Sequence, residues 1–104
     1  MEIPQIQIQE AKQKLDQNGC TFVDIRDPAS YQSAHIPGAL HLHDGNVEGF
    51  IQNSDKEKPL VVYCYHGNSS LGAAAYFMEH GFKNVASMSG GFEAWRQLYE
   101  QEPE

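Results

Sequence analysis

Residues 60–81 read LVVYCYHGNSSLGAAAYFMEHG, and this stretch decides the fold. Its first four residues are apolar or aromatic, as in a strand that is buried on both faces of a parallel sheet. Residues 69–80 then place leucine, alanine and methionine at the spacing of one helix face, and Gly81 suits the C-terminal end of that helix. A buried strand joined by a short loop to a helix is the repeating unit of α/β proteins.

The rest of the chain alternates strand-like and helix-like segments in the same way. We expect an α/β domain of three layers, in which helices cover both faces of a mainly parallel, five-stranded sheet. Asp27 followed by a proline is typical of a helix start, and the glycine pair at 90–91 leads into the last helix. Strands are expected at 6–8, 21–25, 39–42, 60–63 and 85–88, and helices at 10–18, 28–34, 46–53, 69–80 and 92–99.

The composition is that of one globular domain. The chain has 104 residues, of which 40% are hydrophobic and 20% charged. We therefore expect a single domain over residues 1–104, with its core between about 5 and 99. The acidic residues 100–104, EQEPE, are expected to be disordered. The net charge of −7 disfavours nucleic acid as a partner.

Neither a membrane segment nor a secretory signal is found in the sequence. No apolar run approaches the roughly 20 residues that span a bilayer, and residues 1–5 lack the basic start and the apolar stretch of a signal peptide. We therefore expect no membrane partner and a cytoplasmic location. In that reducing compartment a disulfide between Cys20 and Cys64 is not expected, and Cys20 is interpreted as a small buried hydrophobe.

Cys64 stands where the strongest strand ends, and a short polar loop separates it from the next helix. Ligands of open α/β sheets gather at the carboxyl ends of the strands. A loop of this length can turn its backbone N–H groups toward the sulfur, which would stabilise a thiolate and lower the pKa of the thiol. Gly67 and Asn68 tolerate a positive φ, and Ser69 can cap the helix and offer its hydroxyl to a bound anion. The loop alone also fits a buried strand-end thiol beside an ordinary turn.

Four segments of the chain resemble signatures of the rhodanese family. VDIRD at 23–27 matches the first, and AHIPGA at 34–39 matches the second, with alanine where glycine is commoner. CYHGNSS at 64–70 is similar to the active loop of the small single-domain thiosulfate sulfurtransferases, the GlpE type. GGFEAW at 90–95 matches the C-terminal signature. Each match alone is weak, but four in the right order and spacing are specific, and the resemblance covers nearly the whole chain.

The resemblance implies a rhodanese-like domain that moves sulfur through a persulfide on Cys64. The Cys64 thiolate would attack the sulfane sulfur of thiosulfate and release sulfite. A thiophilic acceptor such as cyanide, a small dithiol or thioredoxin would then remove the sulfur. This chemistry requires neither a metal nor an organic cofactor. Substrate contacts are expected from the rest of the loop, at Tyr65, His66, Gly67, Asn68 and Ser69.

Three residues of the matched segments, Asp24, Arg26 and His35, are candidates for accessory roles. Their expected role is an ion pair or hydrogen bonds that fix the loops beside the active site. Arg26 is the best candidate among them for attracting an anionic donor. Tyr65 is expected to shape the pocket wall, and His66 to contact substrate or solvent, since a thiolate that the backbone stabilises needs no base.

Two other functions compete with sulfur transfer for this sequence. Phosphatases with a related loop need an arginine six positions after the cysteine. This chain has Ser70 there and no Arg or Lys in the loop, so a phosphoryl group would lack its main charge partner. The rival from another class is a non-catalytic module that carries sulfur for, or binds, a protein partner. Because the cysteine is present in a domain of this size standing alone, catalysis is favoured.

His41 and His43 resemble a metal-binding pair at first sight. On a strand they would share a face, so chelation is geometrically feasible. No third and fourth ligand follows at a convincing spacing, so we interpret both as solvated or capping residues and predict no metal site.

Overall fold

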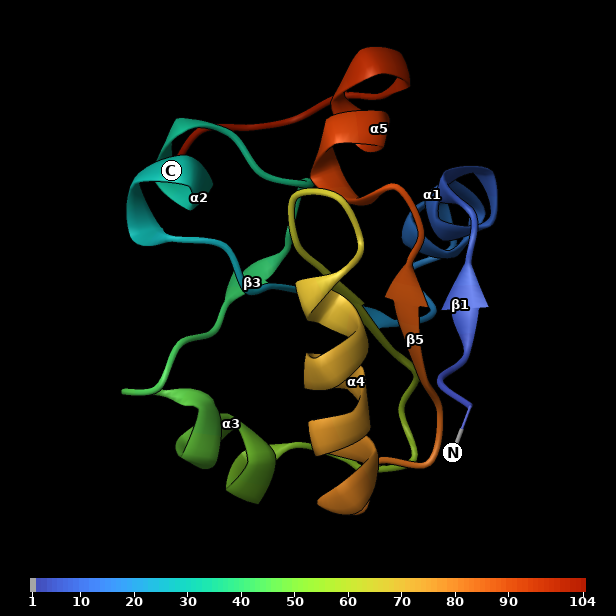
Figure 1. The fold of residues 1–104 in the computed structure, drawn as a ribbon, viewed down its shortest axis with the longest axis vertical. Helices are drawn as coiled ribbons and strands as arrows, with labels where there is room; N and C mark the ends of the chain where they lie inside the picture. The colour runs from blue at the N-terminus through green and yellow to red at the C-terminus, as the bar shows by residue number, and fades with distance from the viewer. Residues whose placement is uncertain (1) are drawn as a thin grey trace.

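The computed structural model describes residues 2–104, and Figure 1 shows its fold. Its strands are β1 (Gln5–Ile6), β2 (Thr21–Asp24), β3 (Leu40–His41), β4 (Leu60–Tyr63) and β5 (Val85–Met88). They form one sheet in the order β1-β5-β4-β2-β3, and every neighbouring pair is parallel. β4 is the central strand of this sheet, so the strand with the strongest sequence signal is also the most enclosed.

Helices cover both faces of the sheet. They are α1 (Ile8–Asp16), α2 (Pro28–Ser33), α3 (Val47–Asn53), α4 (Ser69–Glu79) and α5 (Gly91–Leu98). Val61 and Tyr63 of β4 belong to one core cluster with residues of α1 and α5, whereas Leu60 and Val62 belong to the other with residues of α3 and α4. The alternation of side chains along β4 therefore produces two cores, and the predicted three-layer α/β fold is confirmed.

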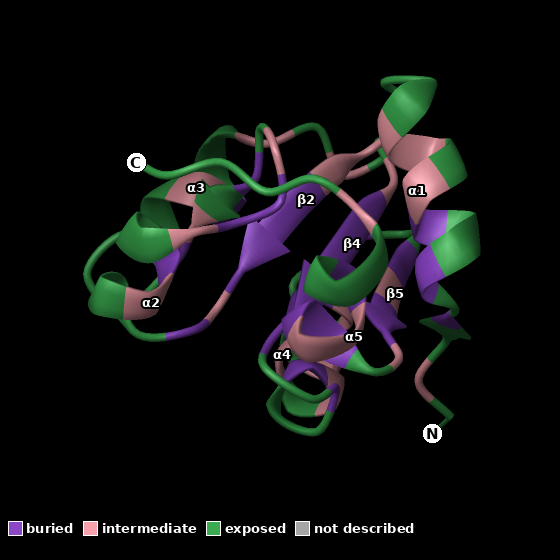
Figure 2. Ribbon diagram, turned by 90° about the horizontal axis from the view of Figure 1, so that it is seen from above, coloured by how far each residue is buried: buried purple, intermediate pink, exposed green. Residues whose placement is uncertain are grey.

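The cores are closed by large side chains from the helices. Trp95 of α5 is fully buried, with its ring 6.4 Å from that of Phe22 on β2. Phe77 of α4 fills the opposite face, with its ring 5.5 Å from that of Phe82. Figure 2 shows the buried strands enclosed between helices whose outer sides are exposed. Over residues 2–104, the helices all lack the length and the apolar character that crossing a bilayer requires.

The boundary between the first strand and the first helix lies at a different residue from the one predicted. The sequence pattern places Ile8 in the first strand, whereas Ile8 is the first residue of α1. The physical reason is the extended backbone of Gln7, whose carbonyl accepts a hydrogen bond from the amide of Ala11 at 3.0 Å. In a helix that begins there, Ile8 and Ala11 lie three residues apart on one face and pack into the same core. The spacing of Ile6 and Ile8 did not reveal this helix start.

The C-terminal segment 100–104, whose composition predicts disorder, makes hydrogen bonds to the loop after α2 and to Trp95. Glu102 and His35 form an antiparallel bridge in which each amide donates to the other's carbonyl at 2.9 Å. The indole of Trp95 donates to the carbonyl of Glu100 at 2.9 Å, and the amide of Gly38 donates to the Glu102 carboxylate at 3.0 Å. Figure 1 shows the segment running from α5 back to α2, where the amide of Glu104 donates to the carbonyl of Gln32 at 3.0 Å. A polar composition favours disorder only where the backbone has no partner, and here the loop after α2 supplies one.

Candidate active site

The loop after β4 positions Cys64 at the carboxyl edge of the sheet. Cys64 directly follows the central strand, and residues 65–68 form the bend that leads into α4, drawn in yellow in Figure 1. The thiol is buried, with 6% of the residue exposed. The topology therefore places this sulfur at the sheet edge where α/β folds bind ligands.

Three hydrogen-bonding groups surround the Cys64 sulfur. The amides of Gly67 and Ser70 donate to Sγ at 3.2 and 3.3 Å, and the Ser70 hydroxyl oxygen lies 3.4 Å away. Burial raises the pKa of the Cys64 thiol, but the hydrogen bonds from Ser70 and from the loop amides outweigh it, so the pKa lies below its ordinary value. The loop is thus built to hold a sulfur anion.

The hydroxyl next to the Cys64 sulfur belongs to Ser70, while Ser69 lines the pocket over it. Asn68 precedes α4 without a side-chain capping bond, and Ser69 is exposed at the first helical position. Ser70 is fully buried. In the sequence, Ser70 stands out only as the position where a phosphatase needs arginine. The available signal was its spacing, since Ser70, Ala74 and Phe77 lie on the one buried face of α4.

The beginning of α5 holds the loop at 64–70 in place. The amide of Phe92 donates to the carbonyl of Cys64 at 2.8 Å, and the amide of Glu93 donates to the carbonyl of Tyr65 at 3.0 Å. A side chain on Gly91 would place its Cβ 2.4 Å from the Tyr65 carbonyl oxygen. The segment 90–95 therefore supports the loop at 64–70 through direct backbone hydrogen bonds.

Asp24 and Arg26 form a buried ion pair beside the pocket. Nη2 of Arg26 lies 2.7 Å from the Asp24 carboxylate and donates to the carbonyl of Ala34 at 2.6 Å. The guanidinium carbon is 4.1 Å from the centre of the Phe92 ring, which belongs to α5. The guanidinium thus joins β2, the segment after α2 and α5, and its charge is matched by Asp24.

His35 lies apart from the sulfur. Its Nδ1 is 2.7 Å from the carbonyl of Tyr31, its ring stacks on that of Tyr31 at 3.8 Å, and its Nε2 is 3.6 Å from the Glu102 carboxylate. Among the accessory candidates, only Arg26 lines the pocket of Cys64. The contacts of His35 fix the loop after α2 and the C-terminal segment.

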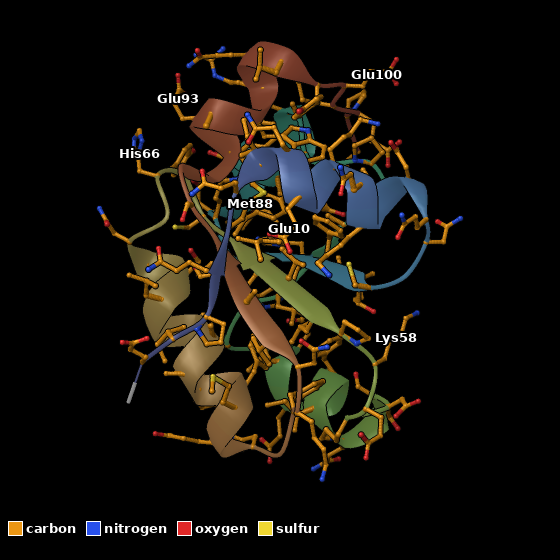
Figure 3. All side chains as sticks on the ribbon, turned by 90° about the vertical axis from the view of Figure 1, so that its right-hand side faces the viewer. Glu10, Lys58, His66, Met88, Glu93 and Glu100 are labelled. Atoms are coloured by element: carbon orange, nitrogen blue, oxygen red, sulfur yellow. The ribbon has the colours of Figure 1, made fainter. Side chains whose placement is uncertain are left out.

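A pocket of about 260 Å³ opens over Cys64. The Tyr65 hydroxyl donates to the Asp27 carboxylate at 3.2 Å and also contacts the Ser30 hydroxyl, which holds the ring as a wall of this pocket. His66 is exposed, and Figure 3 shows its ring on the outside of the loop near Glu93. The lining residues are Ile25, Arg26, Asp27, Cys64, Tyr65, His66, Asn68 and Ser69.

His41 and His43 make hydrogen bonds to the backbone. The Nε2 atom of His41 lies 2.6 Å from the carbonyl oxygen of Arg26, and Nδ1 of His43 accepts from the amide of Gly45 at 3.0 Å. In the described part of the chain, residues 2–104, no group of three or more His, Cys, Asp or Glu is arranged to hold a metal ion.

The pKa values of the two cysteine thiols should lie on opposite sides of the ordinary value for cysteine. Burial raises the pKa of the Cys20 thiol, and the nearby Lys14 and Lys58 offset it only in part, whereas the pKa of Cys64 is lowered. Because iodoacetamide reacts with the thiolate, we expect labelling of Cys64 to rise with pH at a lower midpoint than labelling of Cys20. Peptide mass mapping across pH measures both sites in one sample. Equal midpoints, or a lower one for Cys20, would contradict the assigned electrostatics.

Known proteins resemble this chain over most of its length. Residues 7–98 match the model of the rhodanese-like domain family. The thiosulfate sulfurtransferase GlpE of Pseudomonas syringae pv. syringae (strain B728a) is 50% identical over 93 residues, which cover 89% of this chain and 88% of that protein. The protein of the same name from Pseudomonas paraeruginosa (strain DSM 24068 / PA7) is 52% identical over 90 residues, covering 86% and 82%. A rhodanese-like domain from Anabaena sp., determined by NMR, has a TM-score of 0.86 at 26% identity and covers 100% of this chain and 81% of that one.

Proposed function

Since the chain belongs to the rhodanese family, we propose that it is a thiosulfate sulfurtransferase whose nucleophile and sulfur carrier is Cys64. The observation that carries the proposal is the set of polar groups around Sγ: the amides of Gly67 and Ser70 donate to it at 3.2 and 3.3 Å, and the Ser70 hydroxyl oxygen lies 3.4 Å away. They favour an anionic sulfur, which the reaction requires at both of its stages. Relatives that are about half identical over most of the chain carry the name of this activity.

In the first step the Cys64 thiolate attacks the sulfane sulfur of thiosulfate. A sulfur–sulfur bond forms to Cys64, the bond between the two thiosulfate sulfurs breaks, and sulfite leaves with its electron pair. Cys64 then carries a persulfide whose terminal sulfur is anionic. The amides of Gly67 and Ser70 and the Ser70 hydroxyl offset this charge without a cation.

In the second step an acceptor attacks the terminal sulfur, and Cys64 leaves as a thiolate. Cyanide becomes thiocyanate, and a dithiol such as reduced thioredoxin first becomes a persulfide and then a disulfide with release of hydrogen sulfide. The same donors that stabilise the initial thiolate stabilise the leaving thiolate. Because both cysteines are free thiols and the cycle starts from a reduced Cys64, we place the protein in the reducing cytoplasm.

Steady-state turnover separates this enzyme from a non-catalytic sulfur carrier or binding module. The protein is incubated with thiosulfate and with cyanide, a small dithiol or reduced thioredoxin, and thiocyanate or sulfide is measured against sulfite. We expect one molecule of thiocyanate or sulfide to form for each molecule of sulfite released, and the reaction to continue for many turnovers. A chain that takes up a single sulfur and then stops with all three acceptors would contradict the enzymatic proposal and support the carrier alternative.

The acidic chain predicts a rise in activity with added salt. The net charge is −7, and Arg26, the one described Arg or Lys that lines the pocket, is neutralised by Asp24. A dianionic donor is therefore repelled at long range. Raising the ionic strength from about 0.01 to about 0.15 M shortens the Debye length from about 30 to about 8 Å, and we expect kcat/KM for thiosulfate to rise about two- to fivefold.

The acceptor provides the comparison for this salt effect. The reacting cyanide ion carries one negative charge and thiosulfate carries two, so kcat/KM for cyanide should rise less than kcat/KM for thiosulfate over the same range of sodium chloride. A fall of kcat/KM for thiosulfate with salt would contradict the prediction and would indicate a steering cation, the role that the sequence suggested for Arg26.

A further inference from the structure

Ser87 lies directly behind the active loop, on the neighbouring strand β5. Its hydroxyl oxygen is 2.7 Å from that of Ser70, whose own hydroxyl oxygen is 3.4 Å from the Cys64 sulfur. Ser70 and Ser87 are both fully buried. Ser87 is outside the loop at 64–70 and outside the signature at 90–95, and the mechanism above does not use it. The three residues form a chain of polar groups from the reacting sulfur into the core.

The direction of each hydrogen bond among Cys64, Ser70 and Ser87 follows from the number of available hydrogens and acceptors. Within residues 2–104 the Ser87 hydroxyl has Ser70 as its single hydrogen-bond partner. A buried hydroxyl hydrogen without an acceptor is costly, so Ser87 is satisfied as a donor only when it donates to the Ser70 oxygen. Ser70 must then direct its own hydrogen elsewhere, and the Cys64 sulfur is the remaining partner at 3.4 Å.

This arrangement suits an anionic sulfur better than a protonated one. A thiolate accepts from the two loop amides and from the Ser70 hydroxyl, so every donor has an acceptor. If the sulfur were protonated and donated to Ser70, the Ser70 oxygen would face two donors, and its own hydrogen would lose the sulfur as an acceptor. We propose that Ser87 is a positioning residue, which holds the Ser70 hydroxyl in the orientation that donates to the Cys64 sulfur.

The inference rests on the proposed role of Cys64 as nucleophile, and its test uses a readout that does not need sulfur transfer. The pH midpoint of iodoacetamide labelling at Cys64 is measured in Ser87→Ala, Ser70→Ala and the double variant. Loss of one hydrogen bond corresponds to a roughly threefold to tenfold fall in the thiolate fraction below the midpoint. We expect Ser87→Ala to shift the midpoint upward by that amount and Ser70→Ala to shift it further.

The double variant distinguishes positioning from a general effect on packing. Because Ser87 acts through Ser70, the double variant should label like Ser70→Ala alone. Ser87→Thr keeps a hydroxyl, so its labelling midpoint should equal that of the wild type. Thermal unfolding checks that this variant is folded. Ser89→Ala, which removes a hydroxyl bonded to Gln5 from the segment just after β5, should leave the midpoint unchanged.

The outcomes of this experiment are decisive in both directions. An unchanged midpoint in Ser87→Ala would overturn the proposal, as would shifts that add fully in the double variant. A protein that labels as expected but does not turn over thiosulfate would contradict the proposed function and leave the role of Ser87 in place.

Discussion

Replacement of Cys64 by serine (Cys64→Ser) should abolish thiosulfate turnover while the protein stays folded. Removing the nucleophile of a catalytic group that acts as a unit lowers turnover by about 10³-fold or more. A serine hydroxyl remains protonated near neutral pH, and the donors that favour a thiolate cannot make it an equivalent nucleophile. The substitution exchanges one atom at the end of β4, so the strand and its core contacts are retained. Thiocyanate formation and the thermal unfolding midpoint measure the two effects.

Cys20→Ser is the matched control for this substitution. Cys20 is the only other cysteine of the chain, and it lies just before β2, at the amino end of a strand, whereas Cys64 follows the carboxyl end of β4. We expect Cys20→Ser to keep full turnover. Turnover that survives in Cys64→Ser, or that is lost in Cys20→Ser with the fold intact, would contradict the assignment of the nucleophile.

Replacement of Gly91 by alanine should be the most damaging change outside the loop itself. Gly91 has φ +61, and a Cβ there would lie 2.4 Å from the carbonyl oxygen of Tyr65 and 2.6 Å from that of Cys64. The amides of Phe92 and Glu93 at the start of α5 donate to these two carbonyls, so the clash would disrupt the contact that supports the loop at 64–70. We expect Gly91→Ala to lower the free energy of unfolding by about 2–4 kcal/mol, with turnover impaired even under conditions where the variant is folded.

Urea unfolding of Gly91→Ala and Gly72→Ala makes this prediction specific. Gly72 lies in the exposed side of α4, where an added Cβ meets no atom within 4 Å. Alanine is the better helix former there, and we expect Gly72→Ala to stabilise the protein by about 0.5–1 kcal/mol. If Gly91→Ala unfolds at the same urea concentration as the wild type and retains turnover, the prediction that α5 supports the loop through the close contact at Gly91 is wrong.

Local patterns were sufficient to predict the framework of the fold and the position of Cys64 at the carboxyl end of the central strand. The apolar run at 60–63 is the central strand, and the helical pattern after it is α4 with a single residue of difference at its end. Asp27 caps α2 by accepting from the amide of Ser30 at 3.1 Å, as its position before a proline predicted. These features depend on neighbours in the sequence, which is why a single sequence reveals them.

The parts that could not be predicted depend on contacts between distant segments. Gly91 must be glycine because Tyr65, from another loop, passes within 2.4 Å of the place of its Cβ. Glu102 of the acidic C-terminal segment pairs with His35, and the contact of Ser70 with Ser87 joins α4 to β5. Composition and periodicity do not report contacts between distant segments. The sequence therefore predicts Cys64 as the nucleophile but does not reveal the residues that pack behind it.

The most direct test of the proposed function is the mass of the protein after incubation with thiosulfate alone. We expect the intact protein to gain one sulfur atom, peptide mapping to locate it on Cys64, and cyanide to remove it as one equivalent of thiocyanate. Absence of the gain, or a gain located on Cys20, would contradict the central claim that sulfur passes through a persulfide on Cys64.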